Sequence, residues 1–99
     1  MESEKNTERY LTDEVRKIGG KAYKFVSPGC IGVPDRLVCL PGGRVVFAEL
    51  KSEGKHSTPN QRKQQERLKS LGFTVYSDVD TKAKVDEIVR RIKDEIYTA

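Results

Sequence analysis

The sequence lacks any long apolar run. A membrane-spanning helix needs about 20 consecutive apolar residues, and no apolar stretch approaches that length. A secretory signal needs a shorter apolar core behind a basic start, whereas residues 1–8 (MESEKNTE) are polar and include three glutamates. We therefore expect a cytoplasmic protein that makes no contact with membranes.

Cysteine and histidine are also scarce, which argues against a zinc site. The two cysteines, Cys30 and Cys39, form no Cys-x-x-Cys pair, and His56 is the only histidine. Structural zinc sites need four such ligands at short, regular spacings. In a reducing cytoplasm both thiols would stay free, and we interpret them as small core residues.

The composition is that of a small, mildly basic domain. Charged residues make up 34% and hydrophobic residues 35% of the 99 residues, and there is no internal repeat. A chain of this length closes one modest core, so residues 1–99 are expected to form a single domain. The net charge of +4 favours polyanionic partners such as nucleic acid, although many globular domains are mildly basic.

Hydrophobic periodicity and turn residues divide the chain into seven elements in the order αβββαβα. A first apolar stripe at helical spacing ends at Gly19-Gly20, and Gly42 lies in a Pro-Gly-Gly sequence suited to a tight turn. Thr58 and Gln61 have the spacing of a capping box, which predicts the start of a second helix after a flexible loop. The expected helices cover residues 3–18 and 58–71 and a last segment after Thr81, and the expected strands cover 21–26, 35–40, 44–51 and 73–79.

The predicted hairpin of residues 35–51 carries charges where apolar side chains would give more stability. If the turn pivots about Gly42, Asp35 faces Glu49 across the strands, and Glu49 and Lys51 share one face. Opposed carboxylates repel each other unless a cation lies between them. Mg²⁺ binds carboxylate, water and phosphate oxygens, so this end of the hairpin is a candidate metal site, with Lys51 as a neighbouring charge for a phosphate or a water. An independent surface Asp and a Glu–Lys ion pair would explain the same residues equally well.

Two helical residues are candidates for the same site. On a helical wheel Glu14 falls between Tyr10 and Ile18, on the inward edge of the first helix; a boundary carboxylate that reaches water is the simpler interpretation. Gln61 lies on the stripe of the second helix that faces the sheet. It can complete the capping box and still face the candidate metal site.

Three segments in a fixed order give the sequence a recognisable pattern. The segment GVPD at 32–35, followed by FAELK at 47–51 and STPNQ at 57–61, resembles the PD-(D/E)xK nuclease superfamily and in particular the VRR-NUC domain. The resemblance implies an α/β fold with a restriction-endonuclease-like αβββαβ core, a mixed four-stranded sheet flanked by helices, and an added C-terminal helix. It also implies roles: Asp35, Glu49 and the Leu50 carbonyl as metal ligands, Lys51 as the catalytic lysine, Glu14 as an acid that assists the metal or a water, and Gln61 as a catalytic glutamine.

The same resemblance implies an Mg²⁺- or Mn²⁺-dependent deoxyribonuclease. Such an enzyme would hydrolyse phosphodiesters in branched DNA, for example four-way (Holliday) junctions in repair or recombination, and would act as a homodimer. The apolar stripe of the last helix would form the dimer interface or cover the sheet of its own subunit. The alternatives are a flap, fork or other DNA nuclease, a nucleic-acid-binding module without catalysis, and a small α/β interaction domain. Basic residues near the predicted site are expected to hold DNA phosphates: Arg36, Lys55, His56, Arg62, Lys63 and Arg67.

Overall fold

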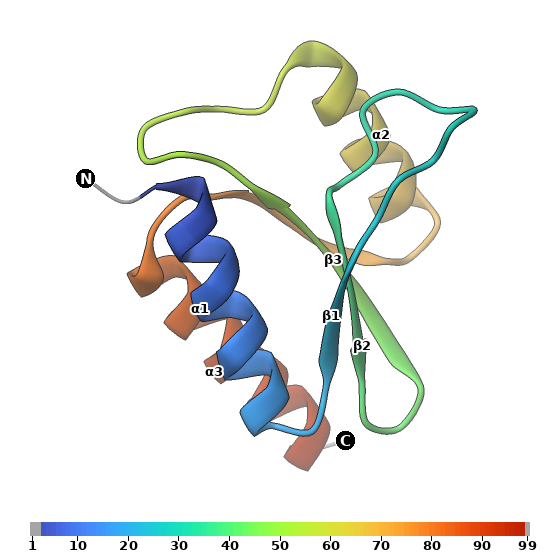
Figure 1. Cartoon of the computed structure of the whole chain (residues 1–99). Helices are drawn as coiled ribbons and strands as arrows, with labels where there is room; N and C mark the ends of the chain where they lie inside the picture. The colour runs from blue at the N-terminus through green and yellow to red at the C-terminus, as the bar shows by residue number, and fades with distance from the viewer. Residues whose placement is uncertain (1–2, 99) are drawn as a thin grey trace.

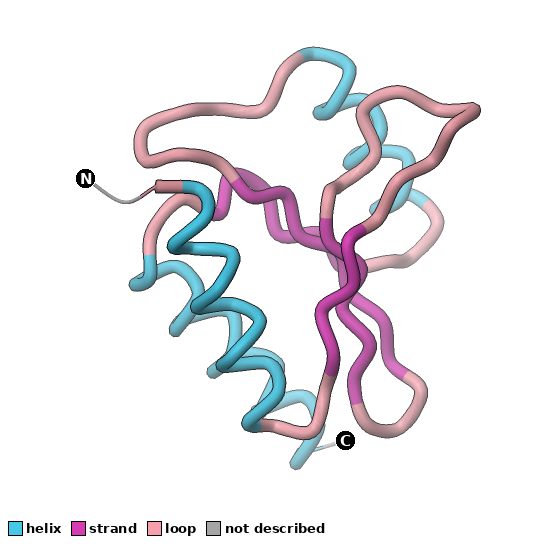
Figure 2. Tube along the Cα trace, in the orientation of Figure 1, coloured by secondary structure: helices cyan, strands magenta, loops and turns pink. Residues whose placement is uncertain are grey.

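Four strands form one mixed sheet, in the spatial order β1-β2-β3-β4. The computed structural model describes residues 3–98. β2 runs antiparallel to both β1 and β3, and β4 runs parallel to β3 because α2 connects the two strands. The strands are β1 (Lys21–Lys24), β2 (Arg36–Leu40), β3 (Arg44–Leu50) and β4 (Thr74–Val79), drawn as arrows in Figure 1 and in magenta in Figure 2.

Three helices cover the two faces of this sheet. Figure 1 shows α1 and α3 side by side on one face and α2 on the other. Ser3, Thr58 and Thr81 each accept a backbone hydrogen bond from the third residue that follows, as helix N-caps do. The mixed α/β fold is therefore the one expected from the sequence. The helices are α1 (Glu4–Lys17), α2 (Pro59–Ser70) and α3 (Lys82–Thr98).

The hairpin of β2 and β3 has the predicted register. Leu40 pairs with Arg44 and Arg36 pairs with Ala48, which is the pairing expected for a turn centred on Gly42. Gly42 has a φ of +81°, a conformation that glycine adopts without strain. The strands themselves are shorter than predicted, since β1 ends at Lys24, β2 begins after Asp35 and β3 ends before Lys51.

The main core lies between the sheet and the pair α1 and α3. Val46, Ala48 and Leu50 alternate along β3 and point into it. The apolar stripe of α3 is buried here, so it covers the sheet of its own chain and is not a free dimer interface. The helical contribution comes from Leu11, Val15, Val85, Ile88, Val89 and Ile92.

A bulge interrupts β4 beside the end of β3. Ala48 pairs with Tyr76, but the next pair joins Leu50 to Val79, so β4 contains one extra residue here. Asp78 takes up the irregularity with a φ of +53°, and Asp is among the few residues other than glycine that tolerate this region. The bulge turns side chains of β4 toward the loop that follows β3.

Cys30 and Cys39 are free and only partly buried, so the prediction that they are core residues was wrong. Among the residues that the structure describes, no helix has the length and apolar character needed to cross a bilayer.

Candidate active site

The open end of the β2–β3 hairpin brings two carboxylates together. Asp35 immediately precedes β2, and its Oδ1 accepts a hydrogen bond of 3.0 Å from the backbone N–H of Leu50. Glu49, the neighbour of Leu50 in β3, is only 3% exposed. The register of the hairpin, in which Arg36 pairs with Ala48, extends by one pair to place Asp35 opposite Glu49, as the sequence predicted.

Burial perturbs the protonation of both acids. It is the largest influence that raises the pKa of Glu49 from 4.5 to about 7; the charge of Asp35 acts in the same direction, and Lys51 opposes it. Burial also raises the pKa of Asp35, against the hydrogen bond from Leu50, and the charge of Glu4 adds to the rise. Both acids would ionise more readily if a cation lay beside them.

Lys51 and Gln61 complete the cluster on the α2 side of the sheet. The Lys51 ammonium donates a 2.7 Å hydrogen bond to Gln61 Oε1 and lies 3.5 Å from Glu49 Oε2. The amide nitrogen of Gln61 donates to the same Glu49 oxygen at 3.2 Å. Gln61 also accepts from the backbone N–H of Thr58 at 2.8 Å, so the predicted capping box holds this side chain in place. These contacts leave one face of the Glu49 carboxylate to other partners.

The donor set fits a hard divalent cation. Glu49 Oε1 is buried and has no hydrogen-bond partner among the described residues, an arrangement that is rare for a carboxylate oxygen. A cation between Asp35 and Glu49 would satisfy this oxygen and offset the repulsion. No group of three or more Asp, Glu, His or Cys side chains in the described part of the chain could hold a metal. Water and backbone oxygens would therefore complete the coordination shell of the cation, which suits Mg²⁺. The Leu50 carbonyl stays a predicted ligand of this kind.

Glu14 does not belong to this cluster. Its carboxylate pairs with Lys17 at 2.6 Å, and it lines an open hollow with Tyr10 and Asp13. It lies ten residues along α1 from Glu4, the helix acid whose charge acts on Asp35, which corresponds to about 15 Å of helix. We therefore correct the expectation that Glu14 assists the metal.

Two other acids of α1, Glu4 and Glu8, lie nearer this end of the hairpin, and the charge of Glu4 acts on Asp35. Glu8 forms a 2.6 Å ion pair with Arg36, the residue that follows Asp35. On the helical wheel with Leu11 at zero, Glu4 lies near 20°, within the apolar stripe of α1, and Glu8 lies near 60°, at its edge. Charged residues on or beside an apolar stripe are a sequence signal for acids near a site, and the sequence interpretation missed this signal.

The predicted DNA contacts divide into two groups. Arg36 is only 7% exposed and is held by Glu8 and by the Asp35 carbonyl, so the prediction that it contacts phosphates was wrong. His56 is exposed and lies 3.6 Å from Asp78. The other predicted contacts are exposed on the loop after β3 and on α2: Lys55, Arg62, Lys63 and Arg67. Of these, Arg62 donates a 2.9 Å hydrogen bond to the Ser57 carbonyl.

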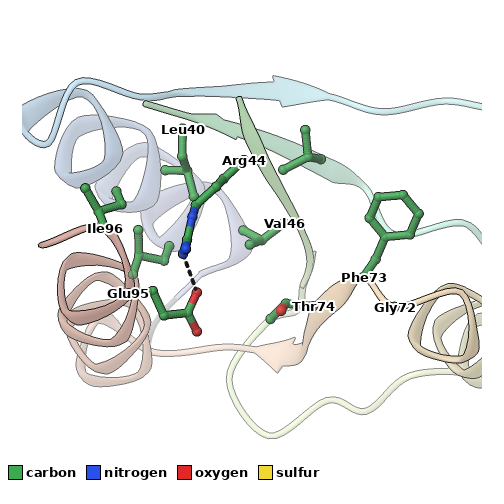
Figure 3. Close-up of a pocket in the computed structure, with 10 residues that line it drawn as sticks. Leu40, Arg44, Val46, Gly72, Phe73, Thr74, Glu95 and Ile96 are labelled. Atoms are coloured by element: carbon green, nitrogen blue, oxygen red, sulfur yellow. Dashed lines mark hydrogen bonds and ion pairs between the residues drawn. The ribbon is translucent and has the colours of Figure 1, made fainter. Parts of the chain in front are cut away.

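A hollow of about 180 Å³ lies at the opposite end of the hairpin (Figure 3). Leu40, Val46 and Ile96 line it, and an Arg44–Glu95 ion pair of 3.4 Å crosses it. Arg44 and Glu49 are five residues apart on β3, a separation of about 17 Å in a strand. This hollow has no carboxylate pair, and we assign the chemistry to the Asp35–Glu49 end.

Comparison with known proteins shows that this chain is similar to nucleases in both sequence and structure. No protein-family model matches the sequence. The chain is 56% identical over 72 residues to the protein named Putative nuclease p44 of Acyrthosiphon pisum secondary endosymbiont phage 1, a match that covers 73% of this chain and 77% of that protein. A solved structure described as a VRR_NUC domain superposes with a TM-score of 0.82 at 30% identity, and the match covers 91% of this chain and 97% of the other.

Proposed function

The chain belongs to the VRR-NUC domain nucleases, and from that membership we propose that it is a divalent-metal-dependent endonuclease that acts on branched DNA. The observation that carries the metal dependence is Glu49 Oε1, which is buried near Asp35 and has no hydrogen-bond partner among residues 3–98. A purely structural ion pair is expected to leave neither carboxylate oxygen buried without a partner. Here Lys51 and Gln61 both contact the same oxygen, Oε2, and the other is left for a ligand.

Each residue of the cluster has a distinct task in this proposal. Asp35 and Glu49 would hold Mg²⁺ or Mn²⁺, which when bound supplies Lewis-acid activation of water and charge neutralisation at the scissile phosphate. Lys51, 15% exposed, would orient the attacking water or stabilise charge on the phosphoryl oxygens. Gln61 fixes the direction of the Lys51 ammonium through its 2.7 Å hydrogen bond.

An exposed apolar side chain beside the site supports selectivity for branched DNA. The loop between β1 and β2 leads into Asp35, and its Gly32 packs directly on Asn60 and Gln61 at the start of α2. Ile31, the preceding residue, is 82% exposed. Apolar side chains of this kind can insert where base stacking is already interrupted, as at a junction or a flap. Lys55 and Lys63 would hold the flanking phosphates.

A homodimer is the second part of the proposal. A symmetric four-way junction must be cut on two strands, and each chain offers one Asp35–Glu49 pair, so a two-fold dimer would supply the two cuts. The stripe of α3 is already used in the core, and the interface would lie elsewhere. Mixing the wild type with an excess of Lys51→Ala would then slow the second cut of a junction more than the first.

The test is cleavage of a matched panel of labelled four-way junction, flap, fork and linear duplex with Mg²⁺, Mn²⁺ or EDTA. We expect cleavage of branched substrates only with metal, and its loss in Asp35→Asn and Lys51→Ala. Ile31→Ser should reduce the preference for branched over linear DNA, while the exposed control Leu71→Ser should leave it unchanged. Binding of all four DNAs without any cutting would favour a non-catalytic module. Cutting of linear duplex at the same rate as branched DNA would refute the proposed selectivity for branched DNA.

A further inference from the structure

The bulge of β4 holds an aspartate in an uncommon conformation next to the loop between β3 and α2. Asp78 has a φ of +53°, which is strained for most side chains. Its Oδ1 accepts hydrogen bonds from the backbone N–H of Ser57 at 2.8 Å and from the Ser57 hydroxyl at 2.5 Å. The bulge therefore aims one carboxylate at one residue of the loop between β3 and α2.

The contact is partly buried, with Asp78 30% exposed, and it belongs to a larger polar chain. Ser57 is 5% exposed and Gln65 of α2 is 3% exposed. Gln65 donates to the Ser57 hydroxyl at 2.9 Å and accepts from Ser77 of β4 at 2.9 Å. Burial would raise the pKa of Asp78, but the hydrogen bonds from Ser57 and His56 outweigh it and hold the pKa below its usual value. The carboxylate therefore stays ionised as an acceptor near neutral pH.

The chain of contacts leads to the active site. Ser57 directly precedes Thr58, the N-cap of α2, and the backbone N–H of Thr58 donates to Gln61 Oε1. The same Gln61 oxygen accepts from Lys51 at 2.7 Å. The loop is fixed at a second point, where the N–H of Gly54 donates to Asp80 at 2.9 Å. The loop that the sequence suggested to be flexible is thus tied to the end of β4.

We propose that Asp78 is a positioning residue for DNA cleavage: through Ser57 it fixes the start of α2, so that the Gln61 amide stays on the Lys51 ammonium. The inference rests on the proposed nuclease function. In the described contacts Asp78 touches neither the carboxylate pair nor the predicted DNA-contacting lysines, although it pairs at 3.6 Å with the exposed His56. We therefore expect Asp78 to act mainly on the rate of the bound complex and only weakly on DNA affinity.

Two substitutions separate this role from backbone strain. Asp78→Gly keeps the positive φ without cost and removes the acceptor, whereas Asp78→Asn tolerates the same φ and retains a carbonyl oxygen for Ser57. We expect kcat on the preferred DNA to fall about 10- to 100-fold in Asp78→Gly, with KM changed less than threefold. Asp78→Asn should recover kcat to within about threefold of the wild type. Ser57→Ala should resemble Asp78→Gly, and the double variant should be no worse than either single one because the two act as a unit.

Thermal unfolding and amide hydrogen exchange complete the experiment. In Asp78→Gly the Ser57 amide should exchange faster, while the β3 amides should stay protected. The inference is overturned if Asp78→Gly keeps wild-type kcat, if it changes KM alone, or if Asp78→Asn is as slow as Asp78→Gly. A wild type that cuts no DNA would instead refute the proposed function, and the exchange of Ser57 would then still decide whether Asp78 fixes the loop.

Discussion

Glu49 is an acid whose environment favours its neutral form. Its pKa of about 7 lies above the ordinary value of 4.5, so the folded chain binds a proton between these pH values that the unfolded chain releases. The stability from this group is therefore fully present below about pH 4.5 and is lost as the pH rises through about 7. At neutral pH the metal-free chain carries an unfavourable carboxylate at its proposed active site.

Glu49→Gln should stabilise the metal-free protein and abolish cleavage. Removing the buried charge beside Asp35 should raise Tm at pH 8 by roughly 4–8 °C, the shift that about 1 kcal/mol produces in a domain of this size. The decrease in Tm as the pH rises from 4.5 to 7 should be smaller in the variant than in the wild type. Circular dichroism melts in EDTA at several pH values measure both effects.

The matched control is Glu14→Gln, because Glu14 is paired with Lys17 away from the site. It should leave the pH dependence of Tm unchanged. Added Mg²⁺ should raise the Tm of the wild type at pH 8 and not that of Glu49→Gln, since only the native acid pair binds the ion. Equal Tm values for wild type and Glu49→Gln in EDTA at pH 8 would contradict the inference that the ionised Glu49 carboxylate destabilises the metal-free protein.

At the scale of elements, the start of α2 combines a helix cap with an active-site contact. Gln61→Ala removes its bonds to Thr58, Lys51 and Glu49, whereas Thr58→Ala removes only the hydroxyl cap and keeps the backbone N–H. Each should lower the free energy of unfolding by about 1 kcal/mol. Only Gln61→Ala should also lower kcat, by about 10- to 100-fold. Urea denaturation and single-turnover cleavage measure the two; equal kcat in both variants would show that Gln61 acts only as a cap.

The loop before Asp35 has a close backbone contact with the same helix start. A Cβ on Gly32 would lie 2.8 Å from the backbone carbon and oxygen of Asn60, and Gly32 has a φ of +94°. Gly32→Ala should therefore cost about 1–3 kcal/mol of stability and reduce cleavage by moving Asp35 or Gln61. Gly29 lies in the same loop with nothing within 4 Å, so Gly29→Ala should be neutral. Chemical denaturation of the pair tests this, and similar stabilities would place the loop farther from α2 than described.

The sequence predicted local geometry well, but it predicted poorly where each helix lies along the length of the sheet. The hairpin register follows from the turn at Gly42 because two adjacent strands have few other ways to pair. The capping box at Thr58 is local in the same sense. A helical wheel gives the direction of a side chain but not how far the helix slides along the sheet, so it could not show that Glu14 lies at the wrong end of α1. The bulge at Asp78 depends on contacts with a distant loop, and no local pattern predicts it.

At the scale of the whole molecule, the proposed site forms where distant segments meet. The N-terminal end of α1, the open end of the β2–β3 hairpin and the start of α2 converge at one end of the sheet (Figure 1), and Glu8, Asp35 and Gln61 come from these three parts. The face of the sheet opposite α2 is closed by α1 and α3 around an apolar core. The outward face of α3 therefore lies across the molecule from the exposed lysines of α2.

This separation predicts which charges DNA binding depends on. Lys55 and Lys63 are exposed beside the site, and Arg90 and Lys93 are exposed on α3. Each double alanine variant lowers the net charge by the same amount, so diffuse attraction to DNA should weaken equally in both. Direct phosphate contacts differ, because each one adds about 0.9 to the slope of log Kd against log salt.

Lys55→Ala/Lys63→Ala should therefore lower that slope by up to about twice this value, while Arg90→Ala/Lys93→Ala should leave it close to that of the wild type. Fluorescence anisotropy with a labelled junction in EDTA, at several salt concentrations, measures the slope without cleavage. If both double variants lower the slope equally, the DNA does not lie preferentially over α2. If only the α3 variant lowers it, the DNA approaches from the face opposite the carboxylate pair, and Asp35 and Glu49 could not reach the scissile phosphate without a second copy of the chain.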